Sequence, residues 1–165
     1  DNKELDVAVP MEVRDDDINI GNLYDAPPRY FVFAGLVFTP LTLDYVKTFG
    51  RNWRGVANSE MIYELYYRRN ETPAKVRKEP VVLASTLAHP VNADMRLASR
   101  AMVDTINGKR IETLEDVIAA FEENTKPQHI IQFISGTVEC LDNTRAELAN
   151  PEILSTYGIQ TDRRL

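Results

Sequence analysis

The chain has 165 residues and a formal net charge of −6, and 44% of its residues are hydrophobic while 27% are charged. These proportions are ordinary for a globular protein, and the length suits one domain with its own core. The acidic balance argues against nucleic acid or an anionic membrane surface as a partner, because such partners demand a basic footprint. No apolar run approaches the length of a membrane span. The single cysteine, Cys140, excludes an internal disulfide.

The N-terminal residues combine a strand pattern with an acidic run. Residues 3–13 alternate apolar and polar side chains, which is the periodicity of a strand. The acidic run at 15–17 invites comparison with a calcium loop of the EF-hand type, but Ile20 and Ala26 stand where that loop needs glycine and glutamate. We therefore predict an edge strand followed by a solvated loop.

An uncharged stretch from Tyr30 to Phe38 follows, rich in aromatic and branched side chains. Such a run fits one strand that is buried on both faces better than a half-solvated strand. Pro40 ends this strand, because a proline cannot donate to a ladder. Thr42 can then cap a short helix that stops at Gly50. The predicted unit is a strand, a tight turn and a helix.

Residues 51–79 contain an amphipathic helix and a basic cluster. After a glycine-bounded loop at 51–55, Asn58 or Ser59 can cap the helix. Its apolar stripe consists of Ile62, Leu65 and Tyr66. The basic cluster consists of Arg68, Arg69, Lys75, Arg77 and Lys78. Two interpretations of the cluster stay open: a solvated connector, or a docking face for an acidic patch on another subunit or domain.

The second half of the chain carries clear turn and cap signals. Asn107-Gly108 and Ser135-Gly136 each predict a two-residue hairpin turn. Residues 113–116 form a capping box for a helix. The apolar face of that helix consists of Leu114, Val117, Ile118 and Phe121. The predicted strands cover 81–87, 101–106, 130–134 and 137–141. Thr144 and Asn150-Pro151 then predict two short helices.

Four segments of the chain resemble one known family. They are RYFVFAGLVFTPL at 29–41, PVVLASTLAHPVNA at 80–93, TINGKRIETLEDVIAAFE at 105–122 and NPEILSTYGIQTDR at 150–163. In this order they resemble the C-terminal PDZ-like domain of Do-like (HtrA/Deg) trypsin-like serine proteases. The resemblance implies an α+β fold of the PDZ-like type, with a small curved antiparallel sheet or partial barrel and flanking helices.

The resemblance also implies how the chain is divided. We expect one PDZ-like domain over residues 1–165. Within it, residues 1–29 would supply the N-terminal edge strand and loop, residues 51–79 an insertion with a helix, and residues 142–165 a C-terminal helical extension. Since the chain begins with Asp1 and shows no leader-like segment, we expect it to be a piece of a longer protein.

A peptide-binding site is implied by the same resemblance. Residues 33–36 fall where PDZ domains keep an aromatic-x-Gly-apolar loop that receives a peptide C-terminus, and such domains add the peptide to a strand beside a helix. The implied site residues are Phe33, Ala34, Gly35, Leu36, Val37, Phe38, Ile118 and Phe121. The same side chains would equally serve a core. Val37 replaces a glycine of the loop, and the continuous apolar run favours a groove filled by the chain itself. The segments 62–66 and 153–159 are candidates to fill it.

No catalytic constellation is found. A serine protease of this family needs a Gly-x-Ser-Gly-Gly-like turn, and none of the five serines stands in one. Cys140 paired with His89 or His129 would be the alternative, a thiol enzyme, but its place in a predicted strand indicates a buried structural thiol. Two histidines without a cysteine or carboxylate at ligand spacing do not make a zinc site. We expect no catalytic residue, no metal and no cofactor.

The predicted function is therefore that of a non-catalytic regulatory or scaffolding domain of a Do-like serine endopeptidase. The implied partners are an upstream protease domain and the sister subunits of a homo-oligomer. Peptides or segments of unfolded proteins are a further class of partner, which would give the domain a role in protein quality control. The free-standing enzyme with Cys140 as nucleophile stays as the alternative. The compartment would be the periplasm or cell envelope in a bacterium, and an organelle or the nucleus in a plant.

Overall fold

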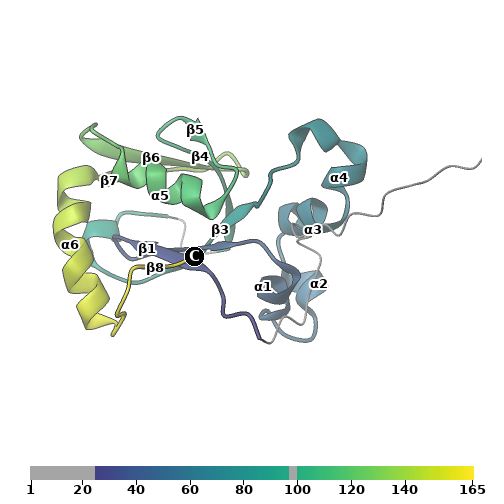
Figure 1. Cartoon of the computed structure of the whole chain (residues 1–165), viewed down its shortest axis with the longest axis horizontal. Coiled ribbons are helices and arrows are strands. Elements are labelled where there is room, and N and C mark those ends of the chain that lie inside the picture. Colours follow the sequence, from purple (N-terminus) through teal and green to yellow (C-terminus); the bar gives the residue numbers. More distant parts are fainter. Residues whose placement is uncertain (1–24, 97–99) are drawn as a thin grey trace, which may run out of the picture.

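The computed structural model describes residues 25–96 and 100–165 (Figure 1). The strand predicted at 3–13 and the acidic loop at 15–17 lie outside these residues. The strands are β1 (Tyr30–Phe33), β2 (Leu36–Pro40), β3 (Val81–Thr86), β4 (Ala101–Ile106), β5 (Lys109–Arg110), β6 (Gln128–Phe133), β7 (Val138–Asp142) and β8 (Arg163–Arg164). The α-helices are α1 (Leu43–Lys47), α2 (Trp53–Val56), α3 (Ser59–Tyr66), α4 (Arg68–Glu71), α5 (Leu114–Glu122) and α6 (Asn143–Thr156), and η1 (Pro73–Lys75) and η2 (Pro90–Asn92) are 3₁₀ turns.

The strands form an antiparallel sheet in the order β7-β6-β4-β3-β2-β1-β8, with β5 paired to β4. Helices α5 and α6 lie toward one end of the molecule, and α1 to α4 lie at the other (Figure 1). This sheet with flanking helices confirms the predicted α+β fold class of the PDZ-like type. Within the described ranges, no helix is long and apolar enough to cross a membrane.

The first half of the central strand β3, from Val81 to Leu83, is buried on both faces. Val81 and Leu83 belong to the main core, which α5 and α6 complete, whereas Val82 belongs to a second apolar cluster. The second cluster contains residues from α1, α2 and α3, so the helical segment 51–79 packs on the opposite face of the sheet from α5. This two-sided burial explains the continuous apolar run at the start of β3.

The stretch from Tyr30 to Phe38 is a hairpin, so the prediction of one continuous strand is wrong. Ala34 and Gly35 both have positive φ, 50° and 83°, which is the backbone geometry of a two-residue type I′ turn. Phe33 and Leu36 pair directly across this turn. The turn was hard to predict because an alanine occupies a position that usually takes asparagine, aspartate or glycine.

Segment 51–79 is more helical than expected. Trp53–Val56 form a short helix where a loop was predicted. The predicted cap Asn58 is confirmed, because its side-chain oxygen accepts a hydrogen bond from the Glu60 amide at 2.9 Å. The predicted apolar stripe is partly wrong, since Tyr66 is 37% exposed. The buried residues of α3 are Met61, Glu64 and Leu65.

Helix α5 has the predicted start and the predicted face. The Thr113 hydroxyl accepts from the Asp116 amide at 3.3 Å, and the Asp116 carboxylate accepts from the Thr113 amide at 3.1 Å. This reciprocal pair satisfies two backbone donors at the helix start. All four residues of the predicted apolar face are buried: Leu114, Val117, Ile118 and Phe121. The register of α5 against the sheet therefore follows from its sequence.

A single helix, α6, replaces the two short helices predicted after residue 143. Its cap is Asp142, whose carboxylate accepts from the Arg145 amide at 2.8 Å, rather than Thr144. Pro151 lies inside the helix, where it lacks a backbone donor. Asn150 does not cap a second helix and instead makes a contact outside α6, described below.

Candidate peptide-binding site

The loop implied as a peptide receptor is held by the chain's own side chains. The Ala34 amide donates to the Asn150 side-chain oxygen of α6 at 2.9 Å. The buried Asn92 side chain donates to the carbonyls of Ala34 at 2.9 Å and Leu87 at 2.8 Å. The Gly35 carbonyl accepts from the Leu87 amide at 2.7 Å. An asparagine therefore occupies the Ala34 amide, one of the donors that the resemblance implied for a peptide C-terminus.

Gly35 is required at this turn for reasons of space as well as of backbone geometry. A Cβ atom on Gly35 would lie 2.5 Å from the Asn92 side-chain nitrogen and 2.5 Å from the Leu87 carbonyl oxygen. The Asn92 side chain, the Leu87 backbone and the Asn150 side chain hold the turn by hydrogen bonds, and we call this set of contacts the clamp. Both atoms that a Cβ would meet belong to the clamp, so moving either of them would disturb a hydrogen bond. The lack of space for a Cβ atom thus explains why this position of the loop is a glycine.

Strand β2, which would receive an added peptide, is paired along both edges. On one side Val37 pairs with Val32 of β1, and on the other side it pairs with Ser85 of β3. Adding a peptide strand requires a free row of backbone donors and acceptors. In this structure β1 occupies the row on the far side from β3.

The outer edge of β1 is covered in turn by β8. Phe31 pairs with Arg163, and the Val32 amide donates to the Asp162 carbonyl at 2.7 Å. The Arg163 guanidinium also pairs with Glu122 of α5 at 2.7 Å and lies 5.2 Å from the centre of the Phe31 ring. The tail at 162–164 therefore links the edge of the sheet to α5.

The helix side of the implied site is filled with aromatic rings. Phe121 packs its ring against Phe31, Phe33 and Phe38, at centroid distances of 6.1, 4.7 and 5.7 Å. Removing such a ring from a core costs about 3–5 kcal/mol. Ile118 is also buried. The structure thus gathers Phe33, Leu36, Phe38, Ile118 and Phe121 into the main core or against it, and Val37 is half-buried.

The sequence analysis considered His129 only as a possible partner of Cys140, whereas the structure buries it beside this aromatic cluster. Its Nε2 atom lies 2.8 Å from the Asn143 side-chain oxygen, so Nε2 carries the hydrogen and donates. Its Nδ1 atom accepts from the side-chain amides of Asn124 at 3.1 Å and Asn107 at 3.3 Å. A proton on Nδ1 would face two N–H donors and no acceptor. The three asparagines therefore select one neutral tautomer.

Burial lowers the pKa of His129 below its ordinary value, although the Asn143 hydrogen bond and the negative charge of Glu147 act in the opposite direction. The ring makes edge contacts with Phe33 and Phe121, at centroid distances of 5.3 and 4.9 Å. Protonation of this ring would place a charge among apolar neighbours, which is unfavourable.

Cys140 is exposed, so the prediction of a buried thiol is wrong. In β7 the inward side chains are Glu139 and Leu141, and Glu139 accepts from the Arg96 amide at 3.0 Å. His129 pairs with Leu141, whereas Cys140 pairs with Ile130, so the thiol and the buried imidazole lie on opposite faces of the β6-β7 ladder. Because alternate residues of a strand point to opposite faces, this register separates the proposed thiol pair.

The other histidine serves the fold locally. The His89 Nδ1 atom accepts from the Val91 amide at 3.2 Å, and the same residue caps η2. Among the residues that the structure describes, no group of three or more histidine, cysteine, aspartate and glutamate side chains could hold a metal ion.

Comparison with known proteins places the chain beside PDZ domains. A family model described as "PDZ domain" matches residues 18–164. A curated protein of Arabidopsis thaliana, "Putative protease Do-like 3, mitochondrial", is 24% identical over 136 residues, which are 82% of this chain and 22% of that protein. The chain thus spans about a fifth of the length of this relative. The resemblance inferred from the sequence is confirmed.

The clamp on the turn predicts unequal effects of two alanine substitutions. Gly35→Ala should destabilise the fold more than Gly136→Ala. Both positions have positive φ, so each pays about 1–2 kcal/mol for an L-residue there, but a Cβ at Gly136 meets nothing within 4 Å. Denaturant titration of the two variants would measure the difference. An equal loss of unfolding free energy in the two variants would show that Asn92 and Leu87 shift to accommodate the added Cβ atom.

The environment of His129 predicts a pH-dependent stability. An imidazole whose pKa is lowered in the folded state is protonated first in the unfolded state, so stability is lost as pH falls below about 6.5 toward the lowered value. We expect the free energy of unfolding to fall between pH 7.5 and 5.5. His129→Gln, which can still donate to Asn143, should flatten this dependence, whereas His89→Gln should retain it. A retained slope in His129→Gln would assign the effect elsewhere.

Proposed function

Because the chain belongs to the PDZ domain family, we propose that it acts as a non-catalytic regulatory and scaffolding domain of a Do-like serine protease. Its peptide-receiving edge is closed by its own chain. The similarity to a Do-like protease of Arabidopsis supports the parent protein, since this relative is several times longer than the chain. PDZ domains work by binding, so the activity would reside in another part of the longer protein.

One observation carries the proposal: both edges of β2 are paired within the domain. A peptide that used the mode typical of PDZ domains would have to displace β1 from β2. Displacement would break the backbone bonds of the hairpin, remove Phe31 and Phe33 from the rings around Phe121, and free the tail at 162–164. Because the cost includes ordered core contacts, peptide capture at this edge is disfavoured.

The proposed partners are the upstream protease domain and the sister subunits of a homo-oligomer. The strands of this domain pair with each other along the edge where a peptide would bind. Other chains would therefore contact the outer surfaces of the domain rather than a groove. In this proposal its work is to hold the protease domain in place within the assembly. Recognition of peptide ends would be a property of another domain.

We expect the intact chain to show no micromolar binding of peptides with free C-termini. Fluorescence anisotropy with labelled peptides that end in apolar residues would measure it. The control is a variant that lacks residues 162–165, in which the edge of β1 is free and the same peptides should bind more tightly. Micromolar binding by the intact chain, with amide NMR shifts confined to 36–38, would show an open groove and overturn the closed edge.

The scaffolding role predicts a loss of assembly. Removing residues 25–165 from the longer protein that contains them should lower its oligomeric state, because contacts between subunits are lost. Multi-angle light scattering would measure the mass, and casein hydrolysis would report on the protease domain. A truncated protein with unchanged mass and unchanged turnover would contradict the role.

A further inference from the structure

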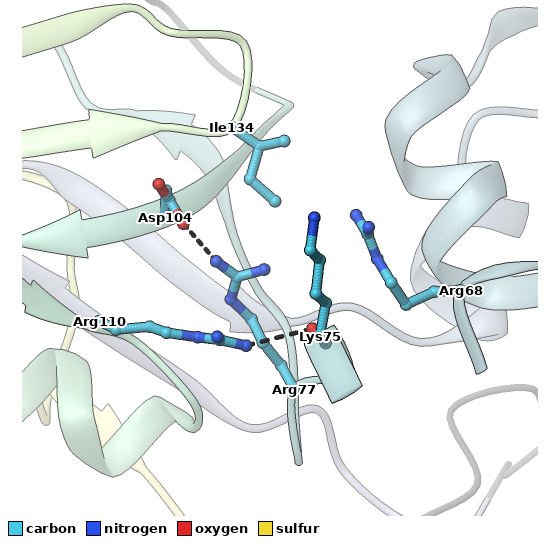
Figure 2. Close-up of a pocket in the computed structure, with 6 residues that line it drawn as sticks. All are labelled: Arg68, Lys75, Arg77, Asp104, Arg110 and Ile134. Carbon is cyan, nitrogen blue, oxygen red and sulfur yellow. Dashed lines mark hydrogen bonds and ion pairs between the residues drawn. The ribbon is translucent and has the colours of Figure 1, made fainter. Parts of the chain in front are cut away.

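A basic pocket lies where the helical segment 51–79 meets the sheet. It encloses about 280 Å³, and Figure 2 shows the side chains that line it: Arg68, Lys75, Arg77, Asp104, Arg110 and Ile134. The first three come from α4, η1 and the connector that follows. Asp104 comes from β4, Arg110 from β5, and Ile134 directly follows β6. Four of the six side chains are cationic and one is a carboxylate.

Two of the cationic side chains, those of Arg77 and Arg110, are engaged in contacts within the domain. Arg77 is only 7% exposed, donates from Nε to the Ile111 carbonyl at 3.0 Å and pairs through Nη2 with Asp104. Arg110 donates to the Lys75 carbonyl at 3.1 Å and pairs with Glu112 at 2.6 Å. These contacts fix the two sides of the pocket to each other.

The other two cations keep donors for a ligand. Arg68 uses Nε for the buried carboxylate of Glu64 at 2.8 Å and Nη1 for Thr72 at 3.4 Å, and no hydrogen bond within the described residues engages its Nη2. The Lys75 ammonium has no ion pair among those same residues. Figure 2 shows both side chains extending into the pocket in the same direction. The buried Glu64 holds Arg68 in this orientation.

We propose that this pocket binds neighbouring carboxylates of an acidic polypeptide segment of a partner protein. The free Nη2 group of Arg68 can donate a charge-assisted hydrogen bond to one carboxylate, and the nearby Lys75 ammonium can take a second carboxylate. The carboxylate of Asp104 in the wall disfavours a phosphate dianion, since like charges repel, and disfavours single negative charges less.

The binding proposed for this pocket would be one way in which the domain performs its scaffolding role. It depends on the proposed function only for the nature of the partner. The pocket contains Arg68, Lys75 and Arg77, three residues of the basic cluster recognised in the sequence. An acidic segment bound there would touch both the helical segment 51–79 and strands β4 and β5. Binding would therefore hold the two parts of the domain together.

The test uses the full chain and a tetra-aspartate peptide that is acetylated and amidated. The blocked ends remove the terminal carboxylate, so the result is independent of the PDZ peptide edge. Calorimetric titration at 25 mM salt should show saturable binding that weakens at 250 mM salt. Lys75→Glu should reduce affinity about tenfold, since an attraction becomes a repulsion. The matched control, Lys126→Glu, makes the same charge change at an exposed site and should leave affinity within about twofold.

Three outcomes would overturn the proposal. They are the absence of saturable binding at low salt, an equal loss in Lys75→Glu and Lys126→Glu, and binding of inorganic phosphate without binding of the peptide. Circular dichroism of each variant verifies the fold, and Lys75 is suited to substitution because it is exposed.

Discussion

The pairing of β1 with β2 is the contact on which the rest of the domain depends. It places Phe33 and Phe31 under α5, so the helix packs on the chain's own rings, and it leaves the outer edge of β1 to be covered by the tail at 162–164. The turn that permits this pairing needs Gly35 in a space bounded by Asn92. The β1-β2 hairpin, the hydrogen bonds of Asn92 and Asn150 to its turn, and the terminal strand β8 thus form one connected unit.

Local signals in the sequence predicted the elements that depend on neighbours in the chain. The capping box at 113–116, the turn at Asn107-Gly108 and the buried face of α5 are all set within a few residues, and the structure has them. The hairpin at 30–38 escaped prediction because its turn contains Ala34, whose positive φ is imposed by tertiary contacts with asparagines distant in sequence. A helix cap or a tight turn can be predicted from neighbouring residues, but hydrogen bonds between residues that are distant in sequence cannot.

The same distinction explains the errors in β7 and in the site. Cys140 was expected to be buried because it stands in a predicted strand, where structural thiols are usually buried. The register set against β6 turns Glu139 inward instead, and the Glu139 carboxylate accepts from the Arg96 amide. One residue of register decides which side chains of a strand are buried. The burial of His129 and its hydrogen bonds were not predicted, since its three asparagine partners come from separate turns and a helix start.

The tail at 162–164 also has a consequence for synthesis on the ribosome. Strand β8 follows β1 by about 130 residues, so the edge of β1 stays without its partner until almost the whole described chain has emerged. During that interval an uncharged, aromatic hairpin presents backbone groups that can pair with other nascent chains. Holding this edge until β8 arrives is a task suited to a chaperone, and the closing step is a contact of high sequence separation and therefore slow.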